Sequence, residues 1–143
     1  MALKTATVAG IPVNPLTLRR AGEFLDSMSS ANRSRYGYTD NSRSSPSITA
    51  VGLLCRLHLG WKKGHPAFRD GVAHLVTAEP TADLYYDYYA TQVMRSVEGD
   101  AWIDWNTKMK QLLLPAYSNQ AHEAGSWHDP VDNGHGAAAA GRL

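Results

Sequence analysis

The 143-residue chain contains a single cysteine, no excess of either charge and no long apolar run. One cysteine, Cys55, excludes a disulfide within the chain. Lysine and arginine number 14 against 13 aspartates and glutamates. This balance gives no electrostatic footprint for nucleic acid, so we expect no nucleic-acid partner. No apolar segment reaches the roughly 18 residues of a membrane span, and the N-terminus lacks the apolar stretch of a signal peptide. We therefore expect no transmembrane segment, and the sequence indicates no compartment.

A strand pattern is also missing, and the apolar spacing predicts helices instead. Asn14 and Pro15 are typical of a helix start, as N-cap and first helical residue. The amphipathic stripe that follows is formed by Leu18, Ala21, Leu25 and Met28. A second amphipathic helix begins at Pro66, and its stripe is formed by Phe68, Val72, Leu75 and Val76. Residues 29–46 are expected to be a loop, from which Tyr36 and Tyr38 fold back onto the body. The predicted class is all-α.

Two kinds of helix alternate along the chain. Mostly apolar helices end at Gly10, Gly60 and Gly99, and an amphipathic helix follows each of them, over residues 15–28, 66–77 and 101–114. A period of roughly 40 to 50 residues with two helices per unit indicates a helical repeat. The apolar helices are expected to be buried on most sides and the amphipathic ones to be half in water, which predicts an inner and an outer layer. We therefore expect residues 1–143 to form a partial α/α toroid of about three helical hairpins, with a loop-rich tail over residues 115–143.

Five segments carry a resemblance to a known family: "YGYTD", "SITAVGLLCRLHLGW", "DLYYDYYATQVM", "WIDWNTKMKQLL" and "HEAGSWHD". They resemble the prenyltransferase and squalene-oxidase repeat proteins of bacteria, which are related to the squalene-cyclase and terpenoid-cyclase α/α-toroid superfamily. Gln120 followed by Gly125-Ser126-Trp127 is similar to the repeat signature of the terpenoid cyclases, with one residue more in between than is usual there. The resemblance covers nearly the whole chain. It implies alternating inner and outer helices, and it assigns Gln120, Gly125 and Trp127 to repeat packing.

The resemblance also implies a longer protein, because toroids of this superfamily close with more helices than this chain supplies. A repeat unit cannot bury its faces alone, and an end unit needs a polar cap. Neither end of this sequence supplies such a cap, so we expect an arc of a larger protein. The isolated chain should then expose apolar inner-helix surface and self-associate.

The catalytic motifs of the superfamily are missing. The acid motif Asp-X-Asp-Asp does not occur, and Asp83 and Asp87 fall at a helix start, where acids favour the helix dipole. The zinc set of the protein prenyltransferases has no counterpart, and we expect Cys55 to pack in the core. The thioester stretch Cys-Gly-Glu-Gln is absent as well. Six possible ligands in the tail have no metal-site spacing and are expected to lie in a solvated loop: His122, Glu123, His128, Asp129, Asp132 and His135. The sequence thus predicts no catalytic residue, no metal and no cofactor.

The tyrosine-rich segment 83–94 supplies the candidate ligand contacts. On a helix, one side holds Tyr85, Tyr88, Tyr89 and Gln92. The other, smaller and more apolar side holds Tyr86, Ala90, Val93, Met94 and Val97. In terpenoid cyclases, aromatic faces line the cavity and stabilise carbocations. The alternative is that the rings fill the space between helices while their hydroxyls bond to loops, and the helical spacing favours this second interpretation.

Two functions remain open. The first is a noncatalytic binding or scaffold domain, with an isoprenoid, another apolar ligand or a protein partner in its cavity or on its rim. The second is a wall segment of a terpenoid-cyclase-like enzyme that acts on an isoprenoid, with the catalytic acid in residues outside this sequence. The missing motifs favour the first, and a shared fold does not transfer activity.

Overall fold

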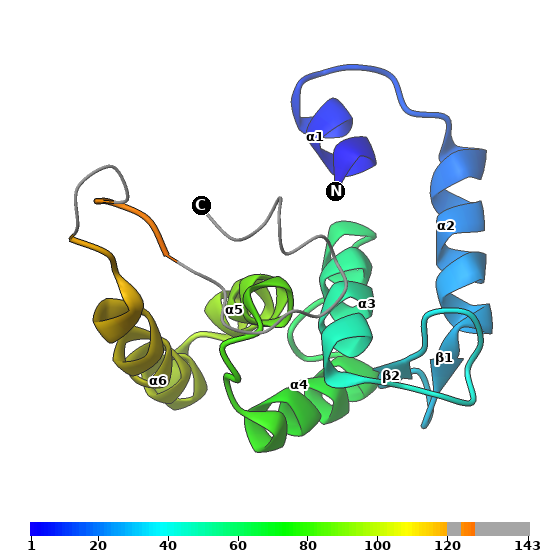
Figure 1. Cartoon of the computed structure of the whole chain (residues 1–143). Helices are drawn as coiled ribbons and strands as arrows, with labels where there is room; N and C mark the ends of the chain where they lie inside the picture. The colour runs from blue at the N-terminus through cyan, green and yellow to red at the C-terminus, as the bar shows by residue number, and fades with distance from the viewer. Residues whose placement is uncertain (120–123, 128–143) are drawn as a thin grey trace. The chain divides into compact units, whose positions relative to one another are not determined.

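The structure is a computed structural model, and it describes residues 1–119 and 124–127. Over these residues it is helical apart from one two-stranded ribbon, which confirms the predicted all-α class (Figure 1). None of the described helices has both the length and the apolar character that crossing a membrane requires. The chain divides into two compact units, Met1–Ala78 and Glu79–Leu143, which we call unit 1 and unit 2.

Unit 1 contains four helices and the ribbon among its described residues. These are α1 (Ala2–Val8), α2 (Pro15–Ser27), β1 (Ser29–Ser30), β2 (Arg35–Tyr36), α3 (Pro46–His58) and α4 (Pro66–Ala78). Helix α3 packs against both α4 and β2, and the core of the unit lies at this junction. The Tyr36 ring lies directly on Gly52 of α3, where a Cβ would collide with it. A glycine inside the helix thus lets the ribbon approach the helix backbone closely.

The ends of the helices in unit 1 follow the local sequence signals. Asn14 caps α2 by accepting a hydrogen bond from the Leu16 N–H at 2.8 Å, as predicted. Gly10 and Gly60 both have positive φ and end α1 and α3, also as predicted. After α3, the N–H of Trp61 donates to the Arg56 carbonyl at 2.9 Å, which completes a Schellman-type cap.

The ribbon in residues 29–46 is a departure from the expected loop. Ser29 pairs with Tyr36 and Ser30 with Arg35 in antiparallel register. Two-residue strands carry no alternation that a sequence pattern could reveal. Tyr36 is buried, as predicted, but Tyr38 is 78% exposed, so that prediction is wrong. The Asp40 backbone folds tightly over Gly37.

The buried face of α4 is narrower than its apolar spacing suggested. Phe68, Val72 and Leu75 are buried, whereas Val76 is exposed, so its predicted place in the core is wrong. Each residue turns an α-helix by about 100°, so Val76 lies about 40° from Val72, on the side away from the buried Gly71 and Leu75. The packed face therefore ends before it.

Unit 2 is built around one helical hairpin, α5 (Leu84–Val97) and α6 (Gly99–Ala116). Trp105 of α6 is buried and donates its indole N–H to the Thr91 hydroxyl of α5 at 2.9 Å. Its ring meets the edge of Tyr86 with 6.1 Å between centroids. Tyr86, Ala90, Val93 and Met94 are all buried, which confirms the predicted packing side of α5.

Candidate functional site

Unit 1 contains a groove of about 640 Å³ between α1, α2 and α3. Neither α1 nor α2 has a fully buried residue, so both face α3 across an incompletely filled space. The predicted stripe of α2 supplies Leu18, Ala21 and Leu25 to one wall. These side chains are half-buried and belong to the groove rather than to a closed core.

Helix α3 and its cap form the floor of the groove. Val51, Cys55 and His58 recur at spacings that place them along one side of the helix. The turn at Gly60 then brings Trp61 beside Arg56, and the guanidinium carbon of Arg56 lies 4.9 Å from the centroid of the Trp61 ring. Trp61 also lines the groove. The floor is therefore apolar with cationic groups set into it.

The charged lining of the groove has one sign. Its ionisable nitrogen-bearing side chains are Lys4, Arg19, Arg56 and His58, and among the residues described no aspartate or glutamate lines it. The chain as a whole has a formal net charge of +1, so this concentration of basic groups is local.

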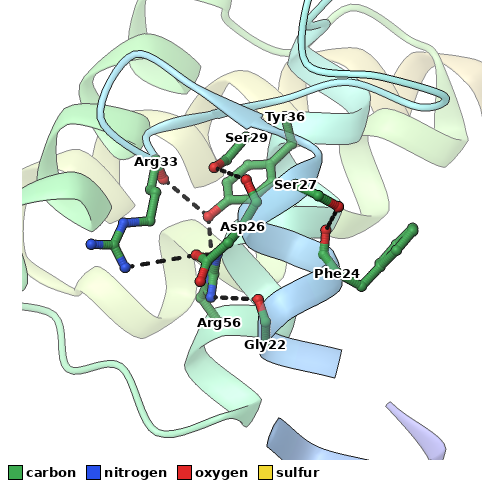
Figure 2. A network of polar contacts seen from close by, with 8 residues as sticks. All are labelled: Gly22, Phe24, Asp26, Ser27, Ser29, Arg33, Tyr36 and Arg56. Atoms are coloured by element: carbon green, nitrogen blue, oxygen red, sulfur yellow. Dashed lines mark hydrogen bonds and ion pairs between the residues drawn. The ribbon is translucent and has the colours of Figure 1, made fainter. Parts of the chain in front are cut away.

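Arg56 is buried beneath the groove and is held by a network that Figure 2 shows from close by. Its Nε donates to the Tyr36 hydroxyl at 3.0 Å, and its terminal nitrogens donate to the Gly22 carbonyl at 3.3 Å and to the Asp26 carboxylate. The Tyr36 hydroxyl in turn donates to the Arg33 carbonyl at 3.0 Å. Burial raises the pKa of Tyr36, against the opposing effect of Arg56.

His58 lies at the end of the groove floor, and its Nε2 atom is buried without a hydrogen-bond partner among the described residues. Burial lowers the pKa of His58, and the positive charges of the N-terminal ammonium and then of Lys4 add to the effect. The imidazole is therefore neutral near pH 7, with its Nε2 atom shielded from solvent.

Cys55 was expected to pack in the core, and the structure places it half-buried in the groove floor. Burial raises the pKa of its thiol, which keeps it protonated at neutral pH. The protonated thiol is a poor nucleophile, and the structure gives Cys55 no catalytic role in the groove.

The candidate cavity residues of α5 lie close together. The rings of Tyr85 and Tyr89 meet edge to face at 4.9 Å, and those of Tyr88 and Tyr89 at 5.1 Å. Tyr85 and Tyr88 are exposed, while Tyr89 and Gln92 are half-buried. The Gln92 amide nitrogen is buried without a partner among the described residues. The aromatic side of α5 is thus an open surface, opposite the side that carries the buried residues.

Asp83 and Asp87 have different structural roles at the start of α5. Asp83 is the N-cap and accepts from the N–H groups of Tyr85 and Tyr86 at 3.0 and 3.2 Å. Asp87 is buried and accepts from the N–H groups of Thr81 and Ala82 at 3.2 and 3.0 Å. The expected structural role at the helix start is confirmed for both.

Of the three repeat-packing residues, Gly125 and Trp127 are described and Gln120 lies outside the described residues. Trp127 donates its indole N–H to the Leu113 carbonyl of α6 at 2.8 Å, and its ring meets Tyr117 at 5.2 Å. Gly125 has a positive φ of 91° in the turn before it. The histidine-rich tail residues 122, 123, 128, 129, 132 and 135 also lie outside the described residues. Within the described part, no group of three or more His, Cys, Asp or Glu side chains could hold a metal ion.

Sequence reasoning missed the groove itself. Lys4 lies on α1, whereas Arg56 and His58 lie near the end of α3, and no motif spacing connects the two elements. The available signal was the interruption of the apolar pattern of residues 47–60 by Thr49, Arg56 and His58.

Comparisons with known proteins find no match for the chain among family models, curated proteins or solved structures.

Proposed function

We propose that the chain is a noncatalytic binding domain of the α/α-toroid type, whose groove in unit 1 holds an isoprenoid or another apolar ligand. The observation that carries the proposal is the groove of about 640 Å³ lined largely by apolar side chains of α1, α2 and α3. Its volume falls within the ~300 to 1,000 Å³ of small-molecule sites, which combine apolar walls with a few placed polar groups.

The order and packing of the helices support the toroid part of the proposal. Helix α3 packs against α4, and α5 packs against α6, so two successive pairs form helical hairpins. Of the helices predicted to be inner, α3 and α5 carry a buried face and α1 buries no residue. Of those predicted to be outer, α6 buries only Trp105 and Met109, whereas α4 is buried to the same extent as α5, so the predicted difference in burial holds for α5 and α6 alone. A helical hairpin of this kind is the unit of many helical repeats.

Binding of farnesol, a neutral isoprenoid alcohol, to the whole chain tests the proposal by titration calorimetry. Ala21 lines the groove on α2, so Ala21→Phe fills it and should weaken binding about tenfold or more. Thr17→Phe adds the same ring to an exposed position of α2 away from the groove and should bind as the parent does. No saturable binding by the parent, or equal binding by the two variants, would contradict the proposal.

A second candidate is a wall segment of a cyclase-like enzyme, and the adjoining rings of Tyr85, Tyr88 and Tyr89 favour it. Their faces could stabilise a carbocation. Incubation with a linear isoprenoid, followed by mass spectrometry of the recovered ligand, separates the candidates. Unchanged ligand supports binding alone, whereas a cyclised product that Tyr85→Ala or Tyr89→Ala abolishes supports the enzyme.

A further inference from the structure

The two units of the chain differ in charge. Residues 1–78 contain ten lysines and arginines against four aspartates and glutamates, whereas residues 79–143 contain four against nine. The near-neutral total therefore hides a basic unit 1 and an acidic unit 2. A charge asymmetry between the halves of a chain indicates that the basic half contacts an anionic partner.

Large exposed apolar side chains gather in the first part of unit 1, on α1, on α2 and between them. Six of the first 24 residues belong to this set: Met1, Leu3, Val8, Ile11, Leu16 and Phe24. The rest of unit 1 adds only Tyr38 and Val76. Scattered apolar residues need no partner, but a concentration of this kind indicates a contact surface.

Part of this set lies at the mouth of the groove. Met1, Leu3 and Phe24 line the groove and are also exposed, so they lie where it opens to the surface. The exposed side chains of Lys4 and Arg19 line the same groove. The N-terminal ammonium of Met1 adds a third positive charge. The mouth therefore combines large apolar side chains with cationic groups.

The positive charge of the mouth is only partly compensated. Among the first 24 residues, Glu23 is the one acidic residue, and it pairs with Arg19 at 3.6 Å. Both side chains are mostly exposed, so water and salt weaken this pair. Arg56 adds no free charge, because the Asp26 carboxylate binds it. One carboxylate thus stands against the three positive charges of the mouth.

The partner must match both the charge and the apolar side chains. A nucleic acid would neutralise the cations but leave the apolar side chains beside phosphates and water. A bilayer with anionic lipid satisfies both, because its headgroups attract the cations and its acyl region accepts apolar side chains without requiring pockets of fixed shape. The strength of such binding grows with both the buried apolar area and the electrostatic attraction.

We propose that α1, α2 and the mouth of the groove dock on the surface of a bilayer that contains anionic lipid. Met1, Leu3 and Phe24 insert at the boundary between headgroups and acyl chains, and Lys4 and Arg19 contact the lipid phosphates. This inference goes beyond the proposed function, since docking requires no ligand in the groove.

Co-sedimentation of the whole chain with vesicles tests the docking. The chain should bind vesicles of phosphatidylcholine and phosphatidylserine in equal parts, and it should bind phosphatidylcholine alone about tenfold or more weakly, because several charges then lose their attraction. Added salt should weaken the binding without abolishing it, since apolar insertion is not screened. No binding to the mixed vesicles would overturn the proposal.

Two matched pairs of variants locate the contact. Arg19→Gln should weaken binding to the mixed vesicles about fivefold. Arg43→Gln makes the same change of charge at an exposed arginine that does not line the groove, and it should stay within about twofold of the parent. Phe24→Gln should also weaken binding about fivefold or more, because an apolar ring no longer inserts. Tyr38→Gln, at an exposed ring outside the groove, should bind as the parent does.

The other partners are outcomes of the same experiment. Equal binding by Arg19→Gln and Arg43→Gln would place the contact away from the mouth, and parental binding by Phe24→Gln would show attraction without insertion, so either result overturns the proposal. If single-stranded oligothymidine at the same phosphate concentration removes the chain from the vesicles, the preferred partner is a nucleic acid and the proposal also fails. The titration with farnesol is independent of these measurements, so the failure of one proposal leaves the other intact.

Discussion

At the scale of single residues, the buried Arg56 guanidinium organises the polar interior of unit 1. Only 4% of this residue is exposed, and a charge in that position requires partners for its donors. Tyr36 from β2, the Gly22 carbonyl and Asp26 from α2 supply them (Figure 2). The network thereby links three elements and holds α2 in place beside the groove, although α2 buries no residue fully.

Asp26→Asn should destabilise unit 1 by about 1–3 kcal/mol, because it leaves the buried guanidinium without its anionic acceptor. Denaturation in urea followed by circular dichroism measures the change. The matched control is Asp70→Asn on the exposed side of α4, which should stay within about 0.5 kcal/mol of the parent. Equal stability of the two variants would mean that the Asp26 carboxylate adds nothing to the network.

His74 makes unit 1 sensitive to acid. The Arg35 guanidinium donates to Nδ1 of His74 at 2.8 Å, so this nitrogen must be unprotonated in the fold. Burial, and then the charge of Arg35, lower the pKa of His74 below its ordinary 6.5. The unfolded chain therefore binds more protons as the pH falls below 6.5, and the stability of the fold decreases there.

Replacing His74 by Gln keeps an acceptor for Arg35 but removes the titration. The variant should lose less stability than the parent when urea midpoints are compared above and below pH 6.5. His58, whose pKa is also lowered, leaves part of the acid sensitivity in place. An NMR titration that gave His74 a pKa at or above 6.5 would overturn this account.

Individual contacts were only partly predictable from the sequence. The burial of Tyr36 was predicted and that of Tyr38 was predicted wrongly, because the turn at Gly37 depends on the Asp40 backbone and not on hydrophobicity. Arg56 stood out as a polar break in an apolar helix. Its partner Asp26 lies on another helix, and no periodic pattern connects the two positions.

At the scale of elements, local chemistry decided what the sequence could predict. Asn14, Gly10 and Gly60 act within a turn of their own helix, so their roles follow from residue type and position. The depth to which a helix is buried depends on its neighbours instead. The stripe of α2 was predicted correctly as apolar, yet it lines a groove because α1 and α3 leave space against it.

The start of α5 provides a test at this scale, because two aspartates one turn apart have different roles. Asp83→Asn should be nearly neutral, since asparagine caps a helix about as well as aspartate. Asp87→Asn should cost about 1–3 kcal/mol, because the buried amide has one acceptor oxygen for the two backbone N–H groups that the carboxylate accepts. Urea denaturation of both variants measures the difference, and equal losses would show that the two carboxylates are interchangeable.

At the scale of the whole molecule, the closed or open form of a toroid stays a prediction, because curvature accumulates over many repeats. What the described residues add is two exposed apolar side chains on α6. Ile103 and Leu114 are 61% and 70% exposed. Eleven residues separate them, about three full turns, so they lie on one face with Thr107 and Lys110 between them.

Single exposed apolar residues are common on protein surfaces and need no partner. Two on one helix face, three turns apart, can instead contact a second molecule together, and we expect the chain to self-associate through this face of α6. Sedimentation velocity should show a sedimentation coefficient that increases with concentration. Ile103→Gln combined with Leu114→Gln should suppress the increase, whereas Thr107→Gln, a polar substitution on the same face, should not. A parent chain that sediments as one monomeric species at every concentration and melts cooperatively would contradict this expectation, since its exposed apolar face would then be stable in water without a partner.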